Sequence, residues 1–449
     1  MIYGGEQINM SVIKARKDYK NLQAAERRKL IYKFLDYYTG ENTNRYIKDK
    51  FSIKAFNEVP LSSFNITKRF IDRMARVYTL GASRTLSSNQ TEYDALTFNK
   101  DYTFKHLEKM TKLLGTIAVQ ISLNTDDKKN PYFEYNPIYN FDVHMDADNP
   151  FKPVAIKYPI LLPTDDTADE SKILYAYWDD NYYKVLDEEG VTVSEKENPY
   201  GTLPFVFFHK DHLIDGFYCY PAYDIINCNE MINIMFTEMN LGMRFQMFGQ
   251  YVITGLYGDE KIKRVGSDEM IILPEGANLS IEAPSINIDQ ALKLARNMIE
   301  LVAQNNHLNV SFADTNKDRP SSGVALKILD VERNDDFLDD LDIWRSIENK
   351  VYRMEKLIAG FEGYKLPNNI GLDFNEPEYP QSVPDQIAMD TWMLENNLTT
   401  KAQLLQRSNK DLTIKQAEKI VKENEKANGG TEEPTQRIFN RLRQGVTGA

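Results

Sequence analysis

The chain has 449 residues, of which 42% are hydrophobic and 11% aromatic, and this ordinary composition excludes an intrinsically disordered protein. No apolar stretch approaches the ~20 residues of a membrane-spanning helix, and the first residues lack the apolar core of a secretory signal peptide, so no membrane partner is expected. Sixty-six acidic against 54 basic side chains give a net charge of −12, which argues against a protein that clamps DNA by its phosphates.

The first half of the chain changes from helical to strand-like patterns. Helical rhythm is predicted for 12–36, for 58–79 with Asn65 as the N-cap, and for 100–114. From 116 to 208, short apolar runs are separated by Asp, Asn, Gly and Pro, which predicts an antiparallel meander. The sequence therefore predicts an α+β protein.

Two long helices are predicted in the middle of the chain, around a small module of strands at 250–287. The first begins at Pro221 and ends near Phe248, and every fourth position of its later part is a methionine: Met231, Met235, Met239, Met243 and Met247. Packing in the core or against another subunit explains these methionines better than a ligand site does. The second helix, 288–307, opens with the capping pair Asn287 and Gln290 and carries one apolar stripe: Ile288, Leu292, Ala295, Ile299 and Val302.

The longest predicted helix begins at Ser321 or Ser322 and ends at Phe361. Its apolar rhythm is interrupted and then resumes, which predicts a kink or a phase shift near 334–336; the resumed stripe is Leu338, Leu341, Trp344, Ile347, Val351, Met354 and Ile358. Seven acidic residues lie between Asp330 and Asp342, balanced only by Arg333. We expect the acidic first half to be solvated and the mixed-charge second half to pack against the body.

The C-terminal part is predicted to hold a short strand at 370–377 and three helices. These helices open at 382–385, 400–403 and 413–416, the last two with Thr-x-x-Gln capping boxes. A linker at 428–434 and a short basic tail follow.

No enzyme motif stands out. A glycine–lysine pair does not occur, so a phosphate-binding P-loop is excluded, and HExxH and GxSxG are also absent. The nearest group of metal ligands is His144, Asp146 and Asp148, although the DADNP sequence here is also a natural strand-ending turn. We therefore expect no enzyme, no cofactor and no metal. Two alternatives stay open: a metal-dependent nuclease or transferase centred on His144–Asp148, and a monomeric helical adaptor or scaffold.

Several phrases, in this order, resemble the portal proteins of tailed double-stranded DNA bacteriophages. Ser322, Gly323, Ala325 and Lys327 open the long helix as the SG-x-A-(L/I)-(K/R) phrase does in portals of long-tailed phages of Gram-positive bacteria. PLSSFNITKRFIDRMARVYTLG, NPYGTLPFVFF and DFNEPEYPQSVPDQIAMDTWMLENNLTTKAQLL are similar to further phrases of that family, and the resemblance covers residues 20 to 425. Asp224 and Asn227 depart from it, because an aromatic run precedes them where the family has a more open helix start.

The resemblance implies a portal architecture with an α/β wing, a two-helix stem, a small β-rich clip, a long tunnel helix and an α-helical crown. The implied boundaries are wing 1–215 with 362–380 returning to it, stem helices 216–249 and 288–307, clip 250–287, tunnel loop 308–320, tunnel helix 321–361, crown 381–427, and linker and tail 428–449.

By the same resemblance, about twelve subunits form a ring at one capsid vertex. Double-stranded DNA passes through it without sequence specificity, and the implied partners are the terminase large subunit, the head-completion adaptor, and the major capsid and scaffolding proteins. Residues expected to touch DNA are Asn316, Lys317, Asp318, Arg319 and Lys327; the acidic channel wall is expected from Asp330, Glu332, Asp335, Asp336, Asp339, Asp340 and Asp342; and clip docking is expected from Asp259, Glu260, Lys261, Lys263 and Arg264. The expected location is the virion, after assembly in the host cytoplasm.

Overall fold

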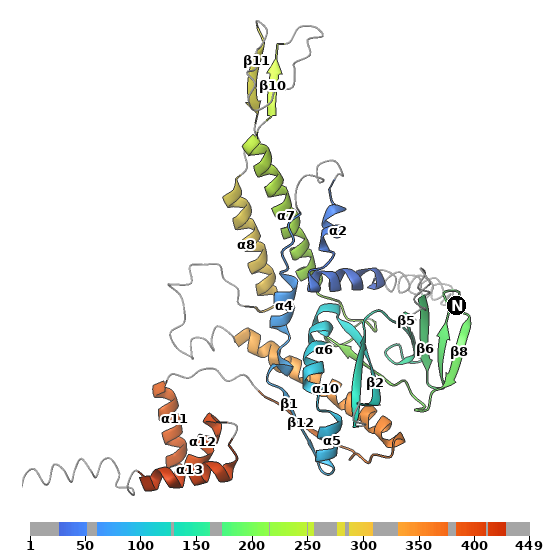
Figure 1. Ribbon diagram of the computed structural model, residues 1–449, viewed down its shortest axis with the longest axis vertical. Coiled ribbons are helices and arrows are strands. Elements are labelled where there is room, and N and C mark those ends of the chain that lie inside the picture. Colours follow the sequence, from blue (N-terminus) through green and yellow to red (C-terminus); the bar gives the residue numbers. More distant parts are fainter. Residues whose placement is uncertain are drawn as a thin grey trace, which may run out of the picture. The chain divides into compact units, whose positions relative to one another are not determined.

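The computed structural model describes residues 27–51, 61–126, 130–161, 173–214, 216–248, 250–255, 276–282, 287–308, 331–375, 383–409 and 412–427. The chain divides into two compact units: unit 1 is Met1–Thr315 with Asp330–Pro377, and unit 2 is Asn316–Leu329 with Glu378–Ala449. Helices and sheets are mixed (Figure 1), which confirms the α+β class. Among the helices described, none combines the length and the apolar character needed to cross a bilayer.

Unit 1 holds two larger sheets rather than the single meander predicted for 116–208. In the first sheet, β2 (Thr116–Thr125) lies between β3 (Pro131–Ile138) and β9 (Phe205–His209). The second is the meander of β4 (Asp142–Met145), β5 (Pro153–Leu161), β6 (Ile173–Asp179), β7 (Tyr182–Leu186) and β8 (Thr192–Glu197). The prediction of one meander was wrong because β2 is buried along consecutive residues, so it is a central strand with a neighbour on each edge.

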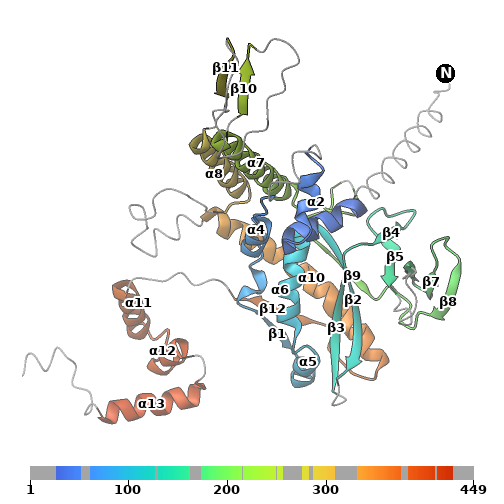
Figure 2. The same ribbon diagram turned by 45° about the horizontal axis from the view of Figure 1, so that its top comes forward.

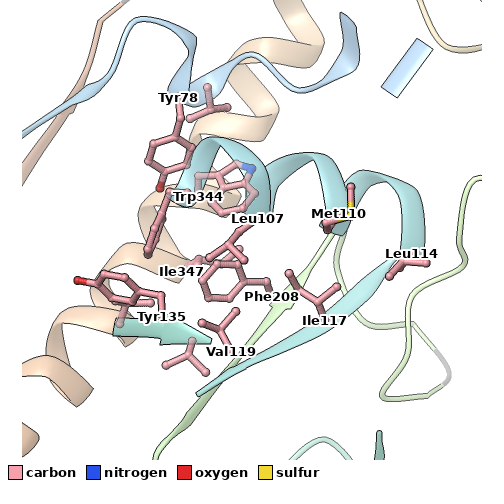
Figure 3. Close-up of a cluster of buried hydrophobic side chains, with 14 of the residues drawn as sticks. Tyr78, Leu107, Met110, Leu114, Ile117, Val119, Tyr135, Phe208, Trp344 and Ile347 are labelled. Carbon is pink, nitrogen blue, oxygen red and sulfur yellow. The ribbon is translucent and has the colours of Figure 1, made fainter. Parts of the chain in front are cut away.

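The core of unit 1 forms where two helices cover the three-stranded sheet. Helix α6 (Lys100–Leu114), as predicted, and helix α10 (Val331–Phe361) contribute Leu107, Met110, Trp344 and Ile347 to a cluster with Ile117, Val119 and Phe208 of the strands (Figure 3). The Trp344 ring stands edge-on to Tyr78 and Phe208, with ring centroids 5.3 and 5.5 Å apart. Each such buried side chain stabilises the fold by ~1.5–3 kcal/mol.

Helix α10 runs without a break through 334–336, the place where a kink or phase shift was predicted. The predicted stripe is confirmed at Leu341, Trp344, Ile347 and Val351, all buried. Leu338 was wrongly placed on it, since its side chain is 46% exposed and Phe337 is buried instead. The predicted start of this helix at 321 lies outside the described residues.

The predicted helix 58–79 is shorter in the structure. It consists of α4 (Thr67–Met74) and the 3-10 turn η1 (Val77–Thr79). The N-cap of α4 is Ile66 and not the predicted Asn65, although the Asn65 side chain, one residue earlier, accepts a hydrogen bond from the Lys68 N–H at 3.1 Å. Elements not predicted are α2 (Thr43–Lys48), β1 (Ala82–Leu86) and α5 (Gln90–Leu96); β1 pairs antiparallel with β12 (Ile370–Phe374), far away in sequence.

Helices α7 (Tyr223–Phe248) and α8 (Ile288–Asn305) lie side by side and antiparallel in unit 1, with the hairpin of β10 (Gln250–Thr254) and β11 (Asn278–Glu282) between them in sequence (Figures 1 and 2). The cap of α8 is as predicted: the Asn287 side chain accepts from the Gln290 N–H at 3.1 Å. On α7 the methionines do not form a core in this chain, because Met231 is 56% and Met247 is 80% exposed. That another subunit buries these methionines stays a prediction.

Polar side chains of α7 hold residues 62–67, the segment that leads into α4, in fixed register. Asn229 accepts from the N–H groups of Ile66 and Thr67 at 2.6 and 3.1 Å. One turn later, Asn233 accepts from the Phe64 N–H at 2.7 Å and donates to the Phe64 carbonyl at 3.2 Å, and then Thr237 accepts from Ser62 at 3.0 Å. Four helical residues advance ~6 Å and two extended residues ~6.6 Å, so the two periods nearly match. We call these side chains the α7 ladder.

The α7 ladder gives a testable prediction. Asn229→Leu leaves the Ile66 and Thr67 N–H groups without their acceptor at the buried start of α4, and we expect it to lower the free energy of unfolding by about 2 kcal/mol. The measurement is denaturant unfolding. Asn349→Leu is the matched control, because Asn349 is exposed and donates to the Arg345 carbonyl of its own helix. Equal losses in both variants would show that the ladder adds no stability.

Unit 2 contains the three predicted C-terminal helices, α11 (Val383–Glu395), α12 (Lys401–Ser408) and α13 (Ile414–Ala427). The capping box of α12 is confirmed: Thr400 accepts from the Gln403 N–H, and the Gln403 side chain accepts from the Thr400 N–H. At α13 the Gln416 side chain accepts from the Thr413 N–H at 2.9 Å. Ala402 and Ala417 are buried where α12 and α13 pack together.

Candidate channel and assembly surfaces

The acidic start of α10 separates into two faces. Asp335, Asp339 and Asp342 are exposed and follow one another at spacings of four and three residues, which places them on one side of the helix. Asp336 and Asp340, four residues apart, lie on another side and contact other elements of unit 1. Only part of the predicted channel wall is thus a solvated acidic face.

Asp340 is directed into unit 1, contrary to the expectation that it belongs to an exposed wall. Its carboxylate pairs with the Lys112 ammonium of α6 at 2.5 Å, and only 14% of its side chain is exposed. Burial raises the pKa of Asp340, while the charge and hydrogen bond of Lys112 oppose this. The pair anchors α10 to α6, so this carboxylate is not a wall residue within the chain.

Asp336 pairs with a residue at the C-terminal end of α8. The His307 Nδ1 lies 2.8 Å from both carboxylate oxygens of Asp336, and both side chains remain nearly half exposed. His307 adopts a left-handed backbone conformation, with φ of 49°. Next to it, Asn306 donates to Asp224 of α7 at 2.7 Å, so the ends of α8, α7 and α10 meet here.

The other predicted site residues are not placed by the structure. Outside the described residues lie Asn316, Lys317, Asp318, Arg319, Lys327 and Asp330, together with the clip residues Asp259, Glu260, Lys261, Lys263 and Arg264. Glu332 lies in α10, but its side chain is not described.

Sequence reasoning missed a buried ionic network that fixes α10 in unit 1. The fully buried Lys100 ammonium lies 3.0 Å from Glu348 and 2.7 Å from Glu355, and Arg84 also pairs with Glu348. The hydroxyl groups of Tyr93 and Tyr135 donate to Glu355. A signal for this network exists in the sequence, since Glu348 and Glu355 continue the seven-residue spacing of buried Leu341 and therefore lie on the apolar face of α10.

A second buried carboxylate holds the turn after α4. Glu108 of α6 accepts hydrogen bonds from the N–H groups of Arg76, Val77 and Tyr78 at 2.6, 2.9 and 3.2 Å. Burial raises the pKa of Glu108 to about 7, although the bonds from Val77 and Tyr78 lower it. These three bonds explain why the predicted helix ends at Met74 and a tight turn follows.

The predicted alternative of a metal site at His144 rests on a turn in the structure. Asp146 accepts from the Asp148 N–H at 3.0 Å and pairs with Lys152 at 3.4 Å, so its carboxylate closes the strand-ending turn. The backbone bond from Asp148, followed by the Lys152 contact, lowers the pKa of Asp146. Across the described residues, no three His, Cys, Asp or Glu side chains are grouped as ligands of a metal ion.

His144 also borders a cavity of about 700 Å³ between the helical residues 27–39, strands β4 and β5, and the segment before α7. The two arginines in its wall already have partners. Arg27 donates to the carbonyls of Phe141 and Thr116 at 3.0 and 3.3 Å, and Arg28 pairs with Asp142. Through these contacts the two arginines hold β4 and β2 against the helical residues 27–39.

Comparison with known proteins gives no match to a protein-family model and no match to a curated protein.

Proposed function

We propose that this chain is the portal subunit of a tailed double-stranded DNA bacteriophage. In this proposal, copies of the chain form a ring at one capsid vertex, through which DNA is packaged by the terminase motor and later ejected. The wing, stem, clip, tunnel helix and crown have the boundaries given above, and the chain is not an enzyme.

The observation that carries the proposal is the arrangement of α7, β10, β11, α8 and α10. A long helix leads to a small β hairpin, a second helix returns beside the first, and the longest helix follows and enters the core of unit 1. The order is that of the stem, clip, stem and tunnel helix in the family that the sequence resembles. A separate three-helix unit then follows in the place of the crown.

The exposed apolar side chains of the proposed stem support assembly with further copies. Met231 and Met247 of α7 and Leu294 and Leu301 of α8 are each more than half exposed in the single chain. Large side chains of this kind are energetically costly in water, and neighbouring subunits of a closed ring would cover them.

Charge supports a conduit rather than a clamp. Asp335, Asp339 and Asp342 form an exposed acidic face, with Arg345 close to Asp342 at 3.1 Å. A wall of like charge to DNA and few fixed cations provides no deep electrostatic wells in which a moving polyanion would stall.

Electron microscopy of the purified chain, combined with native mass, tests the proposal directly. We expect closed rings with a central hole. A uniform monomer at every concentration, also in the presence of scaffolding protein, would contradict the portal function and favour the adaptor alternative. Metal-dependent activity on nucleic acid that Asp146→Ala abolishes would favour the enzyme alternative.

The proposed tunnel loop gives a separate prediction. Replacing Lys317 and Arg319 by alanine removes the two cations expected closest to the DNA phosphates, so we expect rings to form normally while packaging or retention of DNA changes. The measurement is the DNA content of particles assembled with the variant. Lys48→Ala with Lys50→Ala, at exposed positions in and after α2, is the control. Loss of rings in the loop variant would assign Lys317 and Arg319 a structural role instead.

A further inference from the structure

Helix α11 is largely exposed in the described part of the chain, and only Asp390, Met393 and Leu394, on one side, are half-buried. None of its residues from 386 to 395 is buried, and the exposed positions are distributed around the whole helix. Ile387, Met389 and Trp392 are 61%, 44% and 51% exposed, and Leu398 directly after the helix is 64% exposed. An isolated helix of 13 residues is marginally stable in water, and an apolar one is normally covered by protein. The described residues thus leave apolar side chains of α11 exposed, as at a surface that binds a partner.

The charges of unit 2 indicate which surface this is. Helix α11 carries three carboxylates, Asp385, Asp390 and Glu395, and no basic residue. Helices α12 and α13 carry six basic residues against three glutamates, and four of the six form a stripe along α13: Lys415, Lys419, Lys422 and Lys426. The two surfaces are thus complementary in charge, and the same chain carries both.

The lysine stripe of α13 is accessible to a partner. All four lysines of the stripe are exposed. Lys419 lies 3.9 Å from Glu423, and Lys401 of α12 is engaged with Glu425 at 2.9 Å. Within the described part of the chain, Lys415, Lys422 and Lys426 have no acidic partner. Ile414, 41% exposed, adds an apolar position beside them.

We propose that α11 of one copy docks on the α12–α13 hairpin of the next copy, with Asp390 and Glu395 facing Lys415 and Lys422. This inference rests on the proposed ring and names the contact that unit 2 supplies to it. The two surfaces differ, so the contact is head-to-tail, and it leaves one α11 and one hairpin open until the ring closes. Ile387, which lies between Asp390 and Glu395 around the helix, supplies the apolar centre of the contact, and the charges set its register.

Charge reversal with rescue tests the contact. Asp390→Lys with Glu395→Lys, or Lys415→Glu with Lys422→Glu, is expected to raise the concentration for half-assembly about tenfold, and all four changes together are expected to restore it to within about threefold. Sedimentation velocity of the full chain over a concentration series measures this. Glu188→Lys with Glu189→Lys, in the exposed β7–β8 turn, makes the same charge change as the α11 variant and should have no effect.

A second measurement separates contacts between copies from contacts within one copy. Light and heavy-isotope chains are mixed before assembly, and carboxylates are coupled to lysines with a zero-length carbodiimide. Peptides that join 383–395 to 412–427 are expected as light–heavy pairs in the rings. Rings without such pairs, or with couplings only inside one chain, or a four-residue variant that is not rescued, would overturn this contact and leave the portal proposal intact. Absence of rings in the wild type would instead remove the portal proposal.

Discussion

Replacing Lys100 with methionine is expected to lower the free energy of unfolding by about 3 kcal/mol or more. The fully buried ammonium is the only cation described next to Glu355, and it is one of two beside Glu348. Methionine keeps the length of the side chain but leaves these carboxylates without its charge in a site that water does not reach. The measurement is denaturant unfolding at neutral pH.

The control for this variant is Lys29→Met, which makes the same change at an exposed position of the helical residues 27–39. A loss in Lys100→Met no larger than in Lys29→Met would contradict the role of the network. Acid provides a second check. Burial raises the pKa of Glu348, but Lys100 and Arg84 lower it more strongly, to about 2. The stability from this carboxylate is present above its ordinary pKa near 4.5 and is lost as the pH falls towards 2.

Glu108→Leu is expected to have an effect of similar size, about 3 kcal/mol, because it leaves three N–H groups without their acceptor. The Glu108→Gln variant keeps the size of the side chain but removes the group that titrates, so it isolates the effect of the charge on stability. Burial raises the pKa of Glu108 from 4.5 to about 7, so the folded state holds a proton that the unfolded state has released. The contribution of Glu108 to stability is therefore fully present below pH 4.5 and is lost as the pH rises through about 7.

The measurement for Glu108 is the free energy of unfolding between pH 4.5 and 7.5, compared with that of Glu108→Gln. We expect the difference between wild type and variant to change across this interval. Glu92→Gln, at an exposed position of α5, should follow the wild type at every pH. A pH-independent difference would show that Glu108 does not titrate in this range.

Local patterns predicted most of the helices, because helical periodicity and capping are encoded within a few turns. Helix α6 and the caps of α8 and α12 depend on residues close in sequence, and these were predicted correctly. Strands β1 and β12 pair over almost three hundred positions, and nothing local to Ala82–Leu86 indicates that partner. The same reason explains the missed division into two sheets, since β9 joins β2 across the entire meander.

For the candidate site too, local sequence predicted the type of residue but not its contacts. The acidic character of α10 is evident in its sequence, but which carboxylates face water depends on contacts from elsewhere in the chain. Asp340 turns inward because Lys112 lies opposite on α6, and Asp336 meets His307 at the end of α8. The buried position of Lys100 depends on Glu348 and Glu355 of another element, so a lysine in the first turn of α6 looks like a surface residue until the fold is known.

The α7 ladder determines how α7 can move relative to the segment at 62–67. Any sliding along the helix axis must break the bonds of Asn229, Asn233 and Thr237 together, since all three contact one continuous stretch of backbone. A shift by four residues would bring Ile225 or Leu241, whose side chains form no hydrogen bonds, into one position of the ladder. Every other register leaves buried polar groups unpaired, so the α7 ladder fixes the position of α7 along this segment.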